Sequence, residues 1–232
     1  MTIKEINPAE FFDITQYPNC KISCLHVVIN DFAGYVQSMI VRAIDDSWMA
    51  GLDDFDKISY KACAEKTVKE LVNNIFLKAT ALNDDVGEYV VSMSAQEALR
   101  DAKKHTVFPL AEFIKERLKG NGGFDFHTES PSELICFGEA KFSLKDTPRA
   151  EAMNQIEEFI NAKKDNAEAI VLKPLVSDNA QKNFVQNKKG YTAAFYFNAK
   201  NIKTIMKNAL ESTPMKTICQ YPEFYIIAIQ VC

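Results

Sequence analysis

The sequence predicts an α/β protein in which a mixed sheet is flanked by helices. Short runs of branched and aromatic residues alternate with segments whose apolar residues recur at helical spacing, and this alternation is typical of the class. A chain of 232 residues with 47% hydrophobic side chains can bury one substantial core. We therefore expect a single compact domain, with an N-terminal α/β extension over residues 1–82 as an accessory layer and a functional core over residues 83–232.

The accessory layer is expected to contain one strand and two helices. Lys21 to Asn30 is rich in branched residues and predicts a strand, after which Asp31 can cap a helix that runs toward Ala50. A second helix is expected from Ser59 to Lys78, after an acidic loop. The residue types in this layer indicate no chemistry of their own.

The core is predicted to alternate helices with strands, each bounded by a cap or a turn. The expected elements are a helix capped at Asn83, a helical stretch from about Leu110 to Lys119, a hairpin of Phe124 to Glu129 and Ile135 to Phe142, a helix that begins at Thr147-Pro148, and strands at Tyr191 to Phe197 and Glu223 to Val231. The hairpin loop, residues 130–134, contains a proline and two serines, which suit a turn.

This hairpin brings two acids and a lysine together. The five-residue loop sets a register in which Asp125 lies opposite Glu139, and the Cβ atoms of facing residues are roughly 4.5 to 5.5 Å apart. Glu139 and Lys141 project from the same strand face, because alternate residues of a strand do so. A register shifted by one residue would send Asp125 to the other face.

Two carboxylates at this separation repel each other unless a cation lies between them. Mg²⁺ prefers one or two carboxylates together with water and a substrate phosphate, so Asp125 and Glu139 are candidate ligands for Mg²⁺, or for Mn²⁺ as a substitute. Lys141 beside that ion can hold or deprotonate an attacking water and stabilise charge on a phosphate. The alternative is a salt bridge in which Glu139 and Lys141 only neutralise each other.

The two motifs, Gly123-Phe124-Asp125 and Gly138-Glu139-Ala140-Lys141-Phe142, resemble those of the PD-(D/E)xK nuclease superfamily. The core of that superfamily is a restriction-endonuclease-like arrangement of helix, three strands, helix and strand. The chain is more similar still to HamA, the family of nuclease subunits of the Hachiman anti-phage defence system. The resemblance covers about residues 84–165, and it departs from the superfamily pattern in having Phe124 where a proline precedes the first acid.

The resemblance implies a magnesium-dependent DNA endonuclease with little sequence specificity, an effector that works in the cytoplasm under the control of a HamB-like helicase partner. It makes Asp125 and Glu139 metal ligands, adds the backbone of Ala140, and makes Lys141 the catalytic lysine. It also adds two residues for which ordinary explanations exist. Glu88 would be a further acid and metal ligand, although an acid is expected in a first helical turn, and Gln155 would be a site glutamine, although such residues usually face solvent.

The charge distribution offers a second, weaker indication of nucleic-acid binding. A net charge of −4 argues against a protein that coats nucleic acid unaided, but residues 173–232 hold eight lysines against three acids. The lysines that could line a phosphate track are Lys188, Lys189, Lys200, Lys203 and Lys207. The alternative is an ordinary solvated face.

The remaining features of the sequence exclude several other classes of protein. Six cysteines without CxxC pairs indicate reduced thiols, no apolar run approaches the roughly 20 residues of a membrane helix, and the first residues show no signal-peptide core, so we expect a cytoplasmic protein. Two other functions stay open at this stage. They are a catalytically inactive adaptor for a nucleic-acid motor and a standalone restriction-type endonuclease.

Overall fold

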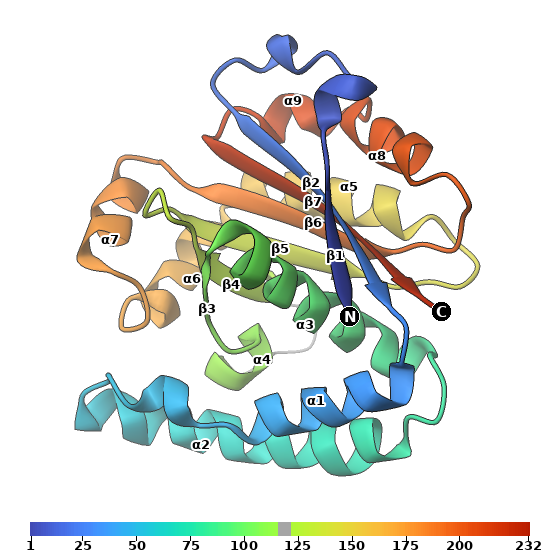
Figure 1. The fold of residues 1–232 in the computed structure, drawn as a ribbon. Helices are drawn as coiled ribbons and strands as arrows, with labels where there is room; N and C mark the ends of the chain where they lie inside the picture. The colour runs from blue at the N-terminus through green and yellow to red at the C-terminus, as the bar shows by residue number, and fades with distance from the viewer. Residues whose placement is uncertain (116–121) are drawn as a thin grey trace.

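The computed structural model describes residues 1–115 and 122–232, and within them seven strands form one mixed, strongly curled sheet (Figure 1). The order across the sheet is β1-β2-β7-β6-β5-β4-β3. The strands are β1 (Thr2–Ile6), β2 (Lys21–Ile29), β3 (Thr106–Val107), β4 (Phe126–Glu129), β5 (Ile135–Lys141), β6 (Gly190–Tyr196) and β7 (Glu223–Val231). The α/β class predicted from the sequence is confirmed.

The described helices pack on the two faces of this sheet. They are α1 (Phe32–Ile44), α2 (Asp54–Glu70), α3 (Asp84–Lys103), α4 (Ala111–Ile114), α5 (Pro148–Asn161), α6 (Lys164–Leu172), α7 (Asp178–Val185), α8 (Ile202–Leu210) and α9 (Met215–Ile218). In Figure 1, α1 and α2 lie side by side as a layer below the sheet, and α5 lies behind the sheet. None of the described helices is both long and apolar enough to span a membrane.

The centre of the sheet is parallel and its two edges are antiparallel. Strands β2, β7, β6 and β5 run parallel, and every residue of β6 is buried, as expected for a strand covered by helices on both faces. Strand β2 pairs with β7 along the full length of both. Residues 1–82 therefore supply two strands to the same sheet as the rest of the chain, in addition to the α1–α2 layer.

Two hydrophobic clusters lie on opposite faces of β5, because its side chains alternate. Phe137 packs with α5 residues such as Met153, whereas Ala140 packs with α3 residues such as Val91. The strand is thus held between two helices. This fixes the position of the polar residues at its carboxyl end.

The hairpin predicted from the sequence is confirmed, including its register. Phe126 pairs with Gly138 and Glu129 with Ile135, so that residues 130–134 form the five-residue loop. Two caps are confirmed as well: the Asp31 side chain accepts the Gly34 N–H at 2.9 Å, and Asn83 caps α3. These features are local, and local sequence patterns specify them.

Other boundaries differ from the prediction. Helix α2 begins at Asp54 and gives way after Glu70 to a π-helical turn, Leu71–Ile75, where the sequence predicts a helix from Ser59 to Lys78. Helix α4 covers only Ala111–Ile114 of the stretch predicted to continue to Lys119, and residues 116–121 lie outside the described residues. Strand β1 was not predicted.

Helix α3 approaches β5 closely because it carries a glycine at the contact. A Cβ atom at Gly87 would lie 2.2 Å from the Phe142 ring, which is far inside van der Waals contact. Only glycine fits between the helix and this ring. The close approach brings the next residue, Glu88, to the carboxyl end of β5.

Gly87→Ala is therefore expected to destabilise the protein by about 1 to 3 kcal/mol, because overpacking a closed contact costs that much. Urea unfolding measures the change. Gly51→Ala is the matched control, since a Cβ at Gly51 meets no atom within 4 Å. Equal stabilities of the two variants would contradict the close contact between α3 and Phe142.

Candidate functional site

Asp125, Glu139 and Lys141 come together where the start of β4 lies beside the end of β5. Glu139 and Lys141 are the fifth and last residues of β5, and Asp125 lies one residue before β4 begins. Glu88 reaches the same place from α3, since its Oε1 lies 3.7 Å from the Lys141 Nζ. Three predicted site residues and one added by the family resemblance are thus neighbours in space.

Asp125 is fixed by two hydrogen bonds to the edge of β5. Its N–H donates to the Gly138 carbonyl at 2.9 Å, and its Oδ2 accepts the Ala140 N–H at 2.8 Å. The Ala140 carbonyl points to the same side of β5 as the N–H, because a strand residue presents both groups to one neighbour. The Ala140 carbonyl and the Asp125 carboxylate therefore lie on the same edge.

Glu139 is a buried carboxylate with one oxygen unused. Its exposed fraction is 1%, its Oε1 accepts a hydrogen bond from Lys141 Nζ at 2.6 Å, and its Oε2 has no hydrogen-bond partner among the described residues. Burial, and then the negative charge of Asp125, raise the pKa of Glu139 well above its ordinary value. A buried anion of this kind is costly unless a cation or a proton reaches its free oxygen.

Lys141 is held as a cation by the acids around it. Burial lowers the pKa of Lys141, but the charges of Glu139, Asp125 and Glu88 together outweigh it and raise the pKa above its usual value. In this arrangement Lys141 is a hydrogen-bond donor and a positive charge. It can therefore orient a water molecule or stabilise an anion.

An acidic cavity of about 400 Å³ opens beside these residues. Its walls come from the π-helical turn, from the first three turns of α3, from the start of α4 and from Asp125. The carboxylates that line it are Asp84, Asp85, Glu88, Glu112 and Asp125. A concave surface with this charge attracts cations.

The donor set fits a hard, partly hydrated cation. The described residues contain no group of three or more His, Cys, Asp or Glu side chains arranged to hold a metal. The available donors are the carboxylates of Asp125 and Glu139 and the backbone carbonyl of Ala140, all of them oxygen. Mg²⁺ characteristically binds to one or two carboxylates and keeps several waters, so these residues fit Mg²⁺ better than Zn²⁺.

Gln155 comes from a different helix. It lies on α5, half-buried beside the core residue Ile156, and is not among the described residues that line the acidic cavity. Its role in the site stays a prediction.

The proposed lysine track is only partly supported. Lys188 and Lys200 are exposed, but Lys203 pairs with Glu10 at 2.5 Å and Lys207 with Glu211 at 3.6 Å. The prediction for Lys189 is wrong. Its side chain is 3% exposed, its Nζ lies 2.6 Å from Asp165 Oδ2, and it packs over the ring of Phe184.

Glu168 holds the segment around Asp125 in place, and no sequence motif indicates this role. From α6, its Oε1 accepts the Phe124 N–H at 3.1 Å, and its Oε2 bonds His127 Nε2 at 2.6 Å. Lys115 also pairs with Glu168. Glu168 therefore binds the residues on both sides of Asp125, and only the tertiary structure shows it.

Mg²⁺ is expected to raise the melting temperature, by about 2 to 4 °C for each kcal/mol of binding free energy. Because the pKa of Glu139 is raised in the folded protein, lowering the pH protonates Glu139, and the proton competes with the metal. The metal-dependent stabilisation should therefore grow as the pH rises through that pKa. In the absence of metal the sign is opposite, since a raised carboxyl pKa lowers stability as the pH rises.

Thermal melts with and without Mg²⁺, at pH 5 and pH 8, test this expectation. Glu139→Gln should remove the metal-dependent shift, and Glu151→Gln, which changes an exposed glutamate on α5, should keep it. An equal Mg²⁺ shift in both variants would place the cation elsewhere.

Lys189→Met is expected to cost about 3 to 5 kcal/mol of stability, because it leaves Asp165 buried and ionised without its partner. Lys188→Met changes the neighbouring, exposed lysine and should stay within about 0.5 kcal/mol of the parent. Urea unfolding of both variants makes the comparison. If Lys189→Met were as stable as Lys188→Met, the Asp165–Lys189 pair would not stabilise the fold.

Comparison with known proteins adds no relative to this picture. No protein family, curated protein or solved structure matches the chain. The chemistry of the site therefore has to be argued from its own residues: a buried carboxylate with a free oxygen, a second carboxylate fixed beside it, and a lysine held as a cation.

Proposed function

We propose that the protein is a metal-dependent nuclease that hydrolyses phosphodiester bonds of DNA. The observation that carries this proposal is the Oε2 of Glu139, which is buried without a partner, with Asp125 fixed at the same strand edge and Lys141 Nζ 2.6 Å from Oε1. Two carboxylates and one lysine around a hard cation are suited to phosphoryl chemistry. Nothing in this arrangement suits a redox cofactor or a covalent nucleophile better.

The order of elements around the site also supports a nuclease. From α3 to β6 the chain runs helix, three strands, helix, strand, with α4 inserted between the first two strands and α6 and α7 before the last strand. This is the order in the PD-(D/E)xK superfamily, which the motifs of the sequence resemble. Asp125 lies just before the second of these strands, and Glu139 and Lys141 lie at the end of the third, next to the first helix.

Each residue has a definable task in the reaction. A bound Mg²⁺ would polarise the scissile phosphate and lower the pKa of a water. Asp125, Glu139 and the Ala140 carbonyl would hold the ion at the strand edge. Lys141 would donate a hydrogen bond to the attacking water or to a phosphate oxygen, and its charge would offset the charge that develops on phosphorus-bound oxygens as the bond to the leaving oxygen breaks.

The family resemblance extends the proposal to the setting of the reaction. We infer an endonuclease of low sequence specificity that acts as the effector of an anti-phage complex with a HamB-like helicase. Its local support is the excess of acids in residues 1–100, fifteen against nine basic residues, which suits a surface that binds a protein partner.

A catalytically inactive adaptor is the second candidate, and one observation favours it. Lys141 pairs with Glu139 at 2.6 Å and approaches Glu88 at 3.7 Å, which is what a purely structural ion cluster would show. Calorimetric titration with Mn²⁺ separates the two functions. Binding that Asp125→Asn weakens supports the nuclease, and absence of binding supports the adaptor.

Glu139→Gln and Lys141→Ala are each expected to lower the rate of plasmid cleavage in Mg²⁺ by about 100-fold or more, since removing one electrostatic group from such a site costs this much. Lys145→Ala, which removes an exposed lysine four residues away, should cleave at the parental rate. The loss of supercoiled plasmid is followed on gels. Equal nicking by all the variants would remove Glu139 and Lys141 from the mechanism.

A further inference from the structure

The acidic cavity adjoins a second cavity along α2. The second cavity has a volume of about 570 Å³ and shares Ile75, Tyr89 and Glu112 with the first. Its outer wall is one face of α2, on which residues three and four apart lie side by side: Cys63, Lys66, Thr67 and Glu70. The two cavities therefore adjoin at these residues, and together, as the groove, they extend from α2 to Asp125.

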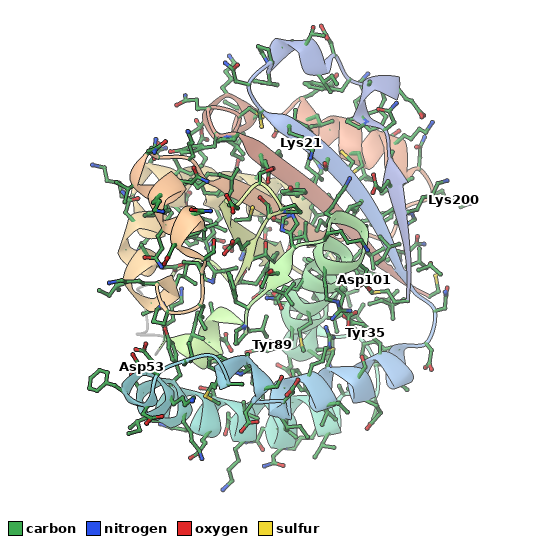
Figure 2. All side chains as sticks on the ribbon, turned by 60° about the vertical axis from the view of Figure 1, so that its left-hand side comes forward. Lys21, Tyr35, Asp53, Tyr89, Asp101 and Lys200 are labelled. Atoms are coloured by element: carbon green, nitrogen blue, oxygen red, sulfur yellow. The ribbon has the colours of Figure 1, made fainter. Side chains whose placement is uncertain are left out.

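The candidate site lies beside the end of this groove that Glu88 and Asp125 line. The π-helical turn (Leu71–Ile75), α3, and Leu110 with Glu112 also line the groove there. Tyr89, labelled in Figure 2, lies between the α1–α2 layer and the part of the molecule that carries the sheet. Glu139 is only 1% exposed. A phosphate must therefore enter the recess to reach the site.

Duplex DNA is poorly suited to such a recess. It is stiff over about 150 base pairs and carries a negative charge for every ~1.7 Å of its axis, so a short segment neither bends into a narrow groove nor tolerates an acidic wall well. A single strand is thinner, bends freely and carries about half that charge per length. The acids of the groove thus disfavour the duplex more than the single strand.

We propose, on the basis of the nuclease function above, that the substrate of this site is single-stranded DNA, which lies in the groove between α2 and α3. Two groups in the groove suit a single strand. Tyr89 stands at the junction of the cavities with its hydroxyl donating to Glu112 at 3.0 Å, and an aromatic ring in a groove stacks on bases of any sequence. Lys66, exposed on the α2 wall, can contact a neighbouring phosphate.

Three labelled DNAs test the proposal with the full chain in Mg²⁺: a single strand, the same strand in a blunt duplex, and a duplex with a single-stranded flap. The single strand should be cut at least about tenfold faster than the blunt duplex, and cuts in the third substrate should fall in the flap. Equal rates on the single strand and the blunt duplex would overturn the proposal and leave the nuclease function standing. Cleavage of none of the three would count against both.

Variants of the groove give a second test that does not touch the reacting groups. Lys66→Glu should raise KM for the single strand by roughly tenfold with little change in kcat, whereas Lys69→Glu, on the other face of α2, should leave KM unchanged. Tyr89→Ala should raise KM in the same way, and Tyr89→Phe, which keeps the ring, should restore it. Unchanged KM values for Lys66→Glu and Tyr89→Ala would show that the strand does not lie in this groove.

Discussion

The burial of the Glu139 carboxylate is the constraint on which the site depends. An ionised carboxylate is rarely kept inside a sheet, because its loss of hydration costs several kcal/mol unless nearby groups replace the water. Here Lys141 satisfies one oxygen and the other is left open, beside a second carboxylate. The pKa of Glu139 is raised as a result, because burial and the charge of Asp125 together outweigh the lowering effect of Lys141.

The rest of the fold can be understood as the support for this arrangement. Strand β5 is held in register by β4 and β6 and packed between α3 and α5, so the carboxyl end of β5 has little freedom. Gly87 allows α3 to approach and bring Glu88 to Lys141. On the far side of Asp125, Glu168 ties down Phe124 and His127. Rigidity of this kind is what a preorganised site requires.

The part of the site that the sequence could predict is the part that depends on local rules. A five-residue loop and the two-residue period of strands determine which residues face one another, and hence the neighbourhood of Asp125 and Glu139. The pairings that it could not predict join distant segments: β2 with β7, Lys189 with Asp165, and Glu168 with His127. A lysine in a polar turn looks exposed in sequence, and only the ring of Phe184 and the Asp165 carboxylate show that Lys189 is buried.

The balance of charge argues for a cation at the site over a closed ion cluster. Lys141 supplies one positive charge to three carboxylates, those of Glu139, Asp125 and Glu88, which all act on its pKa. The cavity beside them adds Asp84, Asp85 and Glu112, and no lysine or arginine is among the described residues that line it. Carboxylates gathered in a recess repel one another and lower stability. This excess of negative charge is therefore not expected if the only role of Glu139 and Lys141 is a structural salt bridge. A divalent cation would balance most of it, and the phosphate of an entering strand would then meet a site close to neutral.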